Sequence, residues 1–275
     1  MIHFDHVSKT YPGGTTAVED FSLTVEQGST TVFLGTSGCG KTTLMRMVNA
    51  MVAPTSGRVF VRGRDVAGED PVRLRRSIGY VLQEGGLFPH RTVADNVATI
   101  PRLEGATKQA SRERALELLD LVGLDRDMAD RYPAQLSGGQ RQRVGVARSL
   151  ANRADILLMD EPFGALDPIV RAELQRELKE IQRALGTTIL FVTHDVDEAF
   201  TLGDQVTVLS TGGHIEQVGT PAELLSSPAS PFVAEFVGAS RAARPVRVAG
   251  PGGLVVDDAG TPVGTLSLDE AGERP

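Results

Sequence analysis

The sequence predicts an α/β protein with a mainly parallel sheet at its core, and three kinds of segment support this class. Short apolar runs of strand length lie at Thr30 to Leu34, Asp155 to Met159 and Thr188 to Thr193. Runs with so few polar breaks are typical of strands buried on both faces. Helical patterns follow at Lys41 to Met51 and at Pro168 to Leu185, the second ended by Gly186. Strands that alternate with helices predict a sheet covered by helices on both faces.

The composition is that of an ordinary globular protein. The 275 residues are 41% hydrophobic and 23% charged, which suits one large domain or two modest ones and excludes global disorder. The net charge of −7 argues against a nucleic-acid partner. Cys39 is the single cysteine, so no intrachain disulfide can form, and a reducing cytoplasm is expected. The first residues lack a signal-peptide pattern, and no run approaches the ~18 apolar residues of a membrane helix.

The middle of the chain, about residues 84–152, differs from the rest because it is helical and charged. Ser111 to Val122 places Ala115, Leu118 and Leu119 on one helical face with Val122. We interpret this part as a helical subdomain inserted into the α/β core. Domain boundaries of 1–238 and 239–275 are then expected, because the composition after Gly238 turns to Gly, Ala, Arg and Pro.

Two further segments precede that boundary. Val206 to Leu209 and His214 to Val218 flank Thr211-Gly212-Gly213, which predicts a β-hairpin. Thr220 to Val237 predicts two short helices separated at Ser226-Ser227-Pro228.

Residues 35–42 match G-x-x-x-x-G-K-[ST] between a predicted strand and a predicted helix, which is the context of a phosphate-binding loop. Its glycines let the backbone wrap a polyphosphate, and the helix start adds positive potential. Lys41 would neutralise the β- and γ-phosphates, and Thr42 would ligate Mg²⁺. A glycine-rich turn without a ligand is the alternative. The candidate nucleotide-binding residues here are Gly35, Thr36, Ser37, Gly38, Cys39, Gly40, Lys41, Thr42 and Thr43.

Cys39 itself has two interpretations. It is either a filler at a variable position, which we favour, or an oxidisable thiol at a helix N-terminus.

Polar residues follow two of the predicted strands. Ile156 to Met159 leads into Asp160 and Glu161, whose side chains leave the strand on opposite sides and can do different work. Asp160 can hold Mg²⁺ through water, and Glu161 can polarise an attacking water. His194 follows another strand and could contact the γ-phosphate and that water. The alternatives are a strand that ends in a polar turn and a surface histidine that caps a strand.

The Ser137 motif, Leu136-Ser137-Gly138-Gly139-Gln140, precedes a helical pattern from Arg141 to Leu150 and forms a second candidate anion site at a helix start. Two such helix starts in different subdomains cannot easily serve one triphosphate within a single chain. Two copies arranged head to tail can, with each nucleotide between the phosphate loop of one copy and the Ser137 motif of the other. An ordinary capped helix is the alternative.

With these motifs in this order, residues 1–238 resemble the ATP-binding subunit of an ABC transporter. The resemblance implies a P-loop NTPase of the ABC ATPase type with N-terminal antiparallel strands, and it implies ATP and Mg²⁺ as ligands. Tyr11 matches the aromatic residue that stacks on adenine. Gln83 matches the glutamine that reaches Mg²⁺ and the attacking water, and it begins the segment that faces the membrane subunits. Ala165-Leu166-Asp167 matches the loop by which two subunits sense each other.

Each of these matches has a plainer interpretation: a core or surface tyrosine, a solvated glutamine, and a helix N-cap at Asp167 before Pro168.

The same resemblance implies the partners and the location of the chain. A second copy of itself and transmembrane permease subunits are expected as direct partners, and an extracytoplasmic solute-binding protein as an indirect one. In the closed dimer, Ser137, Gly138, Gly139, Gln140 and Asp167 would act on the nucleotide held by the other copy. The chain would be peripheral, at the cytoplasmic face of the membrane.

A narrower resemblance, to importers of osmoprotectants such as glycine betaine, choline and carnitine, is carried by three strings, at residues 44–49, 83–93 and 160–168. Importers of amino acids or polyamines share parts of these strings and are the alternative. A soluble ABC ATPase that remodels DNA or ribosomes is disfavoured, because the 53 residues between Gln83 and Ser137 leave no room for a long coiled coil. A regulatory subunit without turnover would lack a catalytic group, and none of Lys41, Gln83, Asp160, Glu161 and His194 is missing.

The tail is too short for a pair of the CBS regulatory domains that follow many osmoprotectant ATPases. Gly253 to Leu266 resembles the strand–turn–strand fragment of one CBS repeat, within a tail of 37 residues, 239–275. We expect a small hairpin or a mobile tail without nucleotide sensing, and a disordered low-complexity end is the alternative.

Overall fold

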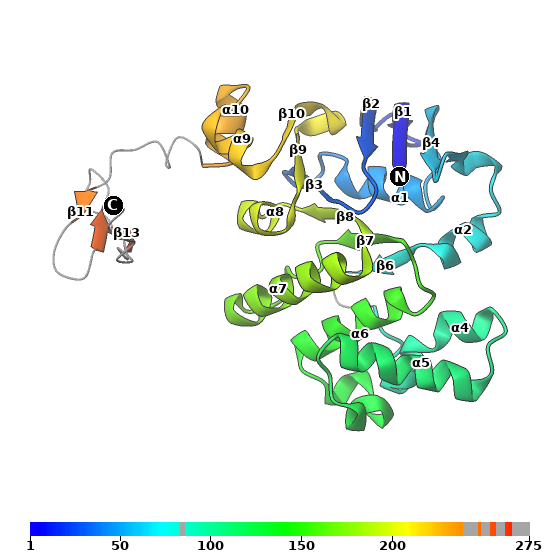
Figure 1. Ribbon diagram of the computed structural model, residues 1–275. Helices are drawn as coiled ribbons and strands as arrows, with labels where there is room; N and C mark the ends of the chain where they lie inside the picture. Colours follow the sequence, from blue (N-terminus) through cyan, green and yellow to red (C-terminus); the bar gives the residue numbers. More distant parts are fainter. Residues whose placement is uncertain (83–85, 239–246, 249–253, 257–261, 266–275) are drawn as a thin grey trace, which may run out of the picture. The chain divides into compact units, whose positions relative to one another are not determined.

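The computed structural model describes residues 1–82, 86–238, 247–248, 254–256 and 262–265 (Figure 1). The chain forms two compact units, Met1–Pro221 and Ala222–Pro275, and each is described by itself. The domain boundary expected from composition, at residue 238, stays a prediction.

The first unit is built around a six-stranded sheet in the order β10-β9-β3-β8-β7-β6. Its strands are β3 (Thr30–Gly35), β6 (Gly79–Val81), β7 (Ile156–Asp160), β8 (Thr188–Thr193), β9 (Gln205–Leu209) and β10 (Ile215–Gly219). β9, β3, β8, β7 and β6 are parallel neighbours in that order, and β10 is antiparallel to β9. Every residue of β3 and β8 is buried. The mainly parallel sheet and the hairpin β9–β10 are therefore confirmed.

A four-stranded antiparallel sheet, in the order β2-β1-β4-β5, forms the second layer of this unit. Its strands are β1 (Ile2–Thr10), β2 (Thr16–Val25), β4 (Ser56–Val61) and β5 (Arg64–Asp65). Three buried rings connect it to the large sheet: Phe21 lies 5.2 Å from Phe4 and 5.6 Å from Phe33 of β3, between ring centroids. Edge-on aromatic contacts of this kind stabilise a core beyond the area that they bury.

The helical middle of the chain is present as a group of short helices and one long pair. Its elements are α3 (Val93–Val97), α4 (Thr99–Leu103), α5 (Lys108–Leu121), two 3₁₀ turns at Arg126–Asp130 and Pro133–Gln135, and α6 (Gly138–Leu150). Figure 1 shows α4, α5 and α6 gathered at the end of this unit away from the antiparallel sheet. The predicted face of α5 is buried at Ala115, Leu118 and Leu119. This helix begins at Lys108, earlier than its apolar pattern, because Thr107 caps it.

The remaining helices of this unit cover or connect the sheets: α1 (Lys41–Val48), a 3₁₀ turn at Val66–Gly68, α2 (Pro71–Ser77), α7 (Pro168–Leu185) and α8 (Val196–Leu202). α7 has the predicted bounds, with Gly186 at φ 63° after its last turn. The prediction for α1 was three residues too long. Ala50 has φ 55°, and the N–H groups of Met51 and Val52 turn back to the carbonyl of Arg46, which ends the helix.

The second unit contains short elements: α9 (Pro221–Ser226), which begins at the boundary, α10 (Pro231–Phe236), β11 (Arg247–Val248), β12 (Leu254–Val256) and β13 (Pro262–Thr265). The two short helices were predicted. β12 and β13 pair antiparallel within the stretch where a strand–turn–strand fragment was expected. Its likeness to a CBS repeat stays a prediction, and residues 257–261 and 266–275 lie outside the described residues.

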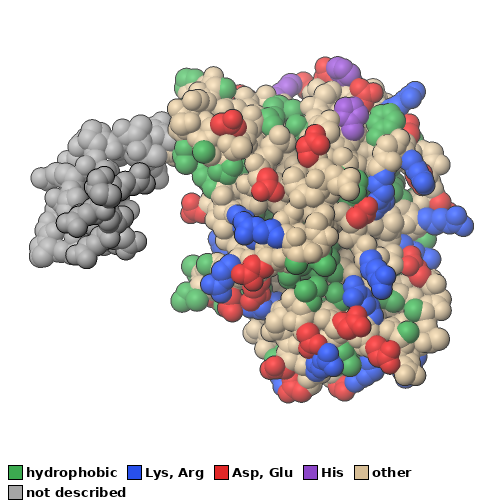
Figure 2. Space-filling model, viewed as in Figure 1, with side chains coloured by type: hydrophobic (Ala, Val, Ile, Leu, Met, Phe, Trp, Pro, Cys, Tyr) green, Lys and Arg blue, Asp and Glu red, His purple; other side chains and the backbone are tan. Residues whose placement is uncertain are grey.

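The helices of the described residues do not include one with the length and apolarity needed to cross a membrane. On the face drawn in Figure 2, acidic and basic side chains are interspersed over the surface. That face therefore carries charges of both signs and not a field of one sign.

Candidate active site

The phosphate loop leaves the carboxyl end of β3 and leads directly into α1. Gly40 precedes the helix with φ 106°, and a Cβ at this position would lie 2.5 Å from the carbonyl oxygen of Ala17. A Cβ at Gly35 would lie 2.4 Å from the carbonyl oxygen of Leu209 on the neighbouring strand β9. Both positions therefore need glycine for reasons of space, and at Gly40 also for its backbone conformation.

The ammonium group of Lys41 is enclosed by this loop. Its Nζ donates to the carbonyl oxygens of Gly35, at 2.7 Å, and of Thr36, at 2.8 Å, and the side chain is buried. Thr36, Ser37 and Gly38 at the tip of the loop are exposed. The loop thus holds a buried positive charge beneath backbone that is open to a ligand.

Cys39 is almost fully buried, and its Sγ lies 3.7 Å from Nζ of Lys41. Burial restricts the access of oxidants to the thiol, which favours the interpretation of Cys39 as a filler and not as an oxidisable thiol.

Asp160, the last residue of β7, lies against the start of α1. The hydroxyl of Thr42 donates to Oδ1 of Asp160 at 2.9 Å. The second oxygen, Oδ2, accepts from the hydroxyl of Tyr80 at 3.4 Å and lies 3.9 Å from Nη2 of Arg46. Both carboxylate oxygens are therefore oriented by neighbours that come from different elements.

Glu161 continues the chain beyond β7 in a conformation that is rare for a residue other than glycine. Its φ is 45°, and its N–H donates to the carbonyl of Val192 on β8 at 2.9 Å. Left-handed backbone at such a residue stores strain of the order of 1 kcal/mol, and strained residues of this kind are enriched at functional sites. The side chain turns toward His194, and Oε1 of Glu161 lies 3.2 Å from Nδ1 of His194.

These contacts separate the two adjacent acids, but strand alternation is not the reason, because β7 ends at Asp160 and Glu161 has left-handed backbone. Asp160 contacts the helix that follows the phosphate loop, whereas Glu161 contacts the residue that follows β8. Because β3, β8 and β7 are parallel neighbours, their carboxyl ends bring Lys41, Thr42, Asp160, Glu161 and His194 to one edge of the sheet. This edge is where α/β proteins place their ligands.

Of the two remaining candidates from the sequence, Tyr11 and Gln83, the structure describes only Tyr11. Tyr11 is partly exposed, and its hydroxyl lies 3.3 Å from the hydroxyl of Thr43 on α1. The ring is therefore beside the helix that follows the phosphate loop, with Nζ of Lys9 over its face at 5.2 Å. Gln83 lies outside the described residues.

The Ser137 motif begins α6 and packs against the start of α7. Ser137 is the N-cap: its Oγ accepts from the N–H of Gln140 at 3.2 Å, and its N–H donates to Oε1 of Gln140 at 2.9 Å. A Cβ at Gly139 would lie 2.7 Å from a methyl of Val170, and one at Gly138 would lie 3.3 Å from a methyl of Leu166. The motif is a capped helix start, as its plainer interpretation required, and Ser137 is also exposed to a partner.

Asp167 caps α7 in the same way, with its Oδ1 accepting from the N–H of Val170 at 3.1 Å. The residue itself is exposed, as is Ile169, at 82%. Asp167 is therefore the N-cap of α7, as its plainer interpretation states. Because the residue is exposed, it is also accessible to a second copy.

The donor set at Thr42 and Asp160 suits Mg²⁺, which prefers hard oxygen ligands and retains places for phosphate and water. The hydroxyl and carboxylate oxygens already lie 2.9 Å apart. Within the part of the chain that the structure describes, no three His, Cys, Asp or Glu side chains cluster as a metal site of their own. A magnesium ion here would therefore be held together with a nucleotide.

Sequence reasoning missed Tyr80 and Arg46, which hold the second oxygen of Asp160. Burial raises the pKa of the Tyr80 phenol, and the hydrogen bond with Tyr80 raises the pKa of Arg46, so both keep their protons. Tyr80 lies opposite Leu158 in the parallel register of β6 and β7. Tyr80 could have been found only by knowing that β6 lies beside β7, and the sequence alone does not give this order.

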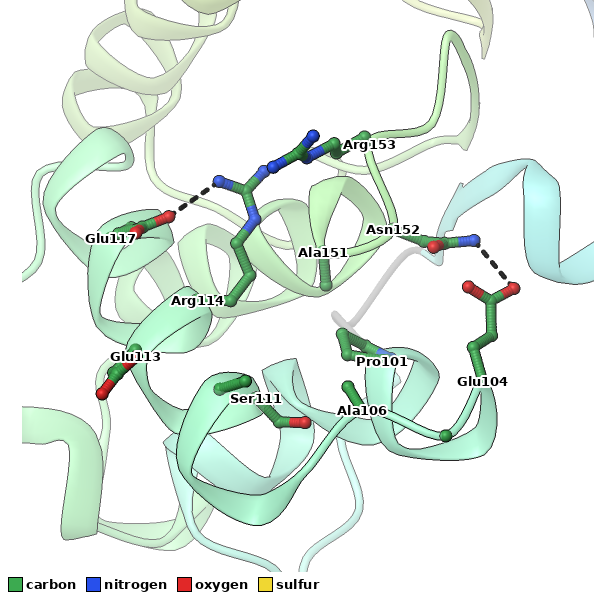
Figure 3. A pocket seen from close by; sticks show the side chains of 12 residues that line it. Pro101, Glu104, Ala106, Ser111, Glu113, Arg114, Glu117, Ala151, Asn152 and Arg153 are labelled. Atoms are coloured by element: carbon green, nitrogen blue, oxygen red, sulfur yellow. Dashed lines mark hydrogen bonds and ion pairs between the residues drawn. The ribbon is translucent and has the colours of Figure 1, made fainter.

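A different hollow, of about 640 Å³, lies in the helical part, between α4, α5 and the end of α6 (Figure 3). Two pairs of its polar groups contact each other, Arg114 with Glu117 and Asn152 with Glu104. It contains none of the phosphate-loop residues, so we do not assign the nucleotide to it.

Comparison with known proteins gives three findings. The sequence model of a family described as "ABC transporter" matches residues 18–164. The carnitine transport ATP-binding protein OpuCA of Listeria monocytogenes serotype 1/2a (strain 10403S) is 51% identical over 241 residues, 88% of this chain and 60% of that protein. The spermidine/putrescine import ATP-binding protein PotA of Thermobifida fusca (strain YX) is 49% identical over 242 residues, 87% of this chain and 62% of that protein. The chain therefore spans about 60% of the length of these relatives.

Among solved structures, the ATP-binding cassette MJ0796, described as a dimer in a post-hydrolysis state bound to ADP and Pi, superposes with a TM-score of 0.72 at 32% identity. The match covers 80% of this chain and 99% of that one. The agreement includes the antiparallel N-terminal sheet, the mainly parallel sheet and the helices. On its sequence and its fold alike, this chain belongs to the ABC transporter family.

Proposed function

We propose that this chain binds and hydrolyses ATP to power an ABC importer. One observation carries the proposal: Lys41, the Thr42–Asp160 pair and the Glu161–His194 pair lie together where three parallel strands end. This arrangement offers a cation for phosphate, oxygen ligands for a metal ion, and a carboxylate beside an imidazole. These are the parts that phosphoryl transfer to water needs.

ATP binding in this proposal uses the loop and the helix start. The ammonium of Lys41 leaves the carbonyl oxygens of Gly35 and Thr36 and donates to the β- and γ-phosphates, and the N–H groups of the exposed residues 36–38 donate to the phosphates as well. Tyr11 stacks on the adenine next to Thr43. Thr42 and Asp160, with Gln83, would hold Mg²⁺, which would supply positive charge next to the phosphate oxygens.

Hydrolysis in this proposal rests on Glu161 as the group that orients the attacking water and accepts its proton. The contact with Nδ1 of His194 fixes the Glu161 carboxylate and leaves Nε2 of His194 for the γ-phosphate. The N–H of Glu161 is held by Val192, so the strained backbone keeps this carboxylate turned away from Asp160. One acid can therefore serve the metal ion while the other serves the water.

A second copy of the chain completes each site in this proposal. Ser137, Gly138, Gly139, Gln140 and Asp167 of one copy face the nucleotide held by the other, in a head-to-tail dimer with two nucleotides between the subunits. The exposure of Ser137 and Asp167 supports this, as does the dimer reported for the relative of known structure.

We further propose that permease subunits dock beside the segment that follows Gln83. A groove of about 500 Å³ lies there, lined by Phe88, Arg91, Asp95, Thr99, Arg102 and Leu103. Leu103 is 55% exposed and Phe88 39%, so the groove offers apolar contacts between charged groups. The chain would thus be a peripheral subunit at the cytoplasmic face, coupled indirectly to an extracytoplasmic solute-binding protein.

The transported solute is proposed to be a quaternary amine such as glycine betaine, choline or carnitine. The strings at residues 44–49, 83–93 and 160–168 support this, together with the relative named for carnitine transport. An importer of another small polar solute is the second candidate, because a relative named for spermidine and putrescine import is 49% identical. In domain terms, we propose an ATPase domain at 1–238, with a helical subdomain at about 84–152, and a tail at 239–275.

Phosphate release by the purified chain tests the hydrolytic part of the proposal. We expect the wild-type protein to hydrolyse ATP, and Glu161→Gln to lower turnover by about 100-fold or more while ATP still binds. Because the nucleotide then stays intact between two copies, the variant should accumulate as an ATP-dependent dimer in size-exclusion chromatography. Glu180→Gln, an exposed acid on α7, is the matched control. Wild-type turnover in Glu161→Gln would remove the role given to Glu161.

The solute is tested by reconstituting the chain in liposomes with a permease and a solute-binding protein of an osmoprotectant importer. Stimulation of ATP hydrolysis by glycine betaine, choline or carnitine is expected. Stimulation by spermidine or an amino acid alone would favour the second candidate.

A further inference from the structure

Arg171, in the first turn of α7, contacts two loops of the candidate active site at once. Its Nη2 donates to the carbonyl oxygen of Leu166, the residue before Asp167, at 3.2 Å. Its Nη1 donates to Oδ2 of Asp195, the residue after His194, at 3.0 Å. One side chain therefore joins the segment that would reach the partner's nucleotide to the segment that carries His194.

The residues around His194 are themselves held on both sides. The hydroxyl of Thr193 accepts from the N–H of Asp195 at 3.0 Å and donates to Oε2 of Glu198 at 2.7 Å. Oδ1 of Asp195 caps α8 by accepting from the N–H groups of Asp197 and Glu198. A displacement of Asp195 should therefore move the backbone on both sides of His194, because hydrogen bonds connect Asp195 to Thr193 and to the start of α8.

Two polar atoms in this network form no hydrogen bond in the part of the chain that the structure describes. Nε of Arg171 and Oε1 of Glu198 are both buried, and neither has a hydrogen-bond partner within the described residues. The two atoms lie 3.8 Å apart, close enough for an ion pair but beyond hydrogen-bond distance. A relative movement of about 1 Å would form this bond, because such bonds are about 2.9 Å long. Since an unpaired buried group is costly, the network favours the movement that closes it.

We propose that Arg171 is a positioning residue that couples Asp167 to His194, so that contact of a second copy with Asp167 sets His194 for hydrolysis in the chain's own site. The proposal rests on the proposed ATPase function. Engagement of Asp167 by the second copy moves Leu166, and Arg171 follows because it holds the Leu166 carbonyl. The guanidinium then closes on Glu198 and carries Asp195 with it.

The planar fork of arginine suits this role better than a lysine ammonium. Arg171 serves three acceptors in three directions, the Leu166 carbonyl and the carboxylates of Asp195 and Glu198. A single flexible ammonium cannot reach all three, so lysine keeps the charge but not the connection. Comparing arginine with lysine at position 171 therefore distinguishes a role in connecting the two loops from a role of the positive charge alone.

The experiment measures phosphate release against ATP concentration for the full chain and for Arg171→Met, Arg171→Lys and Arg176→Met. Arg176 is exposed on the same helix and is the matched control. We expect the wild-type Hill coefficient to lie near 2 and that of Arg171→Met to fall toward 1, because two coupled sites become independent. Maximal turnover should fall about 5-fold, while the affinity of the phosphate loop for a fluorescent ATP analogue changes less than about 2-fold. Arg171→Lys should behave like Arg171→Met.

Asp195→Asn provides a second route to the same measurement if Arg171→Met does not fold. The amide retains the oxygen that caps α8 and loses the charge that faces Arg171, so the Hill coefficient should fall in this variant also. A Hill coefficient near 1 in the wild-type protein, an unchanged value in Arg171→Met or Asp195→Asn, or an equal loss in Arg176→Met would overturn the coupling. A wild-type protein that releases no phosphate overturns instead the proposed function on which it rests.

Discussion

The two helix starts of this chain that could meet a phosphate are built in different ways. At α1, the phosphate loop is connected to residues of other strands: Thr42 holds Asp160, and Glu161, the next residue, holds His194. At α6, the hydrogen bonds of Ser137 remain within the first turn, and the glycines only make room for α7. Both starts have the glycines that anion binding requires, but their polar groups have different partners.

This difference indicates a division of labour between the two ends. The α1 end combines the cation, the oxygen ligands and the two acids within one chain, so it can hold a nucleotide by itself. The α6 end presents an exposed serine at a helix start, and the side-chain hydrogen bonds of Ser137 among the described residues are with Gln140, so this end offers N–H groups and the positive end of a helix to an anion. In the proposed function, the first end therefore binds the nucleotide, and the second completes the site of a nucleotide held by another copy.

The largest effect is expected at the α1 end, from Lys41→Met. The variant removes the buried ammonium that would face the β- and γ-phosphates, so ATP affinity should fall by about 100-fold and turnover should be lost. Isothermal titration with ATP and phosphate release measure the two effects. Lys108→Met, at the exposed start of α5, is the control and should bind ATP like the wild type. An unchanged affinity for ATP in Lys41→Met would contradict the assignment of the α1 end as the nucleotide-binding end.

Ser137→Arg tests the other end and should leave the first site intact. ATP should bind the variant within about 2-fold of the wild type, whereas the ATP-dependent dimer formed in the Glu161→Gln background should be lost. Thr107→Arg is a matched control, because Thr107 also caps a helix, α5, in the same helical part. Each variant loses a cap worth about 1 kcal/mol, so a difference in dimerisation is not a difference in stability. An equal loss of the dimer in Thr107→Arg would contradict the assignment.

The glycines of the two ends should differ in the cost of a methyl group. A Cβ at Gly35 meets the backbone of β9 at 2.4 Å, whereas one at Gly139 meets a side-chain methyl of Val170 at 2.7 Å. Because a strand within a sheet moves less easily than a side chain, Gly35→Ala should cost about 3 kcal/mol of unfolding free energy and Gly139→Ala about 1. Gly68→Ala, with no atom within 4 Å, is the control. Urea denaturation gives the order, and equal costs at Gly35 and Gly139 would contradict this reading of the two environments.

What the sequence could predict follows from how local each signal is. The bounds of α7 were predictable because Pro168 and Gly186 mark its ends within a few residues. The end of α1 was not, because Ala50 takes left-handed backbone that its residue type does not announce. The phosphate-loop residues and both acids were candidates because their motifs are contiguous. Tyr80 and Arg171 were missed because their partners, Asp160 and Asp195, are 80 and 24 residues away along the chain.

The smallest effect concerns the pH dependence of stability, through Glu198 of α8, which accepts from Thr193, the residue before His194. Burial raises the pKa of this carboxyl, against the opposing hydrogen bond from Thr193 and the charge of Arg171. Since the folded pKa lies above the unfolded value, the unfolded chain releases this proton first as the pH rises. The stability that Glu198 contributes is therefore complete below its ordinary pKa of 4.5 and declines as the pH rises through the raised value.

Glu198→Gln should flatten this part of the pH profile, because the amide keeps an oxygen for the Thr193 hydroxyl and does not ionise. Urea denaturation of the wild type and the variant between pH 4 and pH 7 measures the difference in slope. The α6 end offers the matched control, since Gln140→Glu places a carboxyl in the capping box of Ser137. Water solvates a carboxylate there, so we expect this substitution not to reproduce the effect of Glu198. A Glu198→Gln profile parallel to that of the wild type would mean that the pKa of Glu198 is the same in the folded and unfolded states. The contrast between a helix start with distant partners and one whose hydrogen bonds stay within its first turn would then not extend to electrostatics.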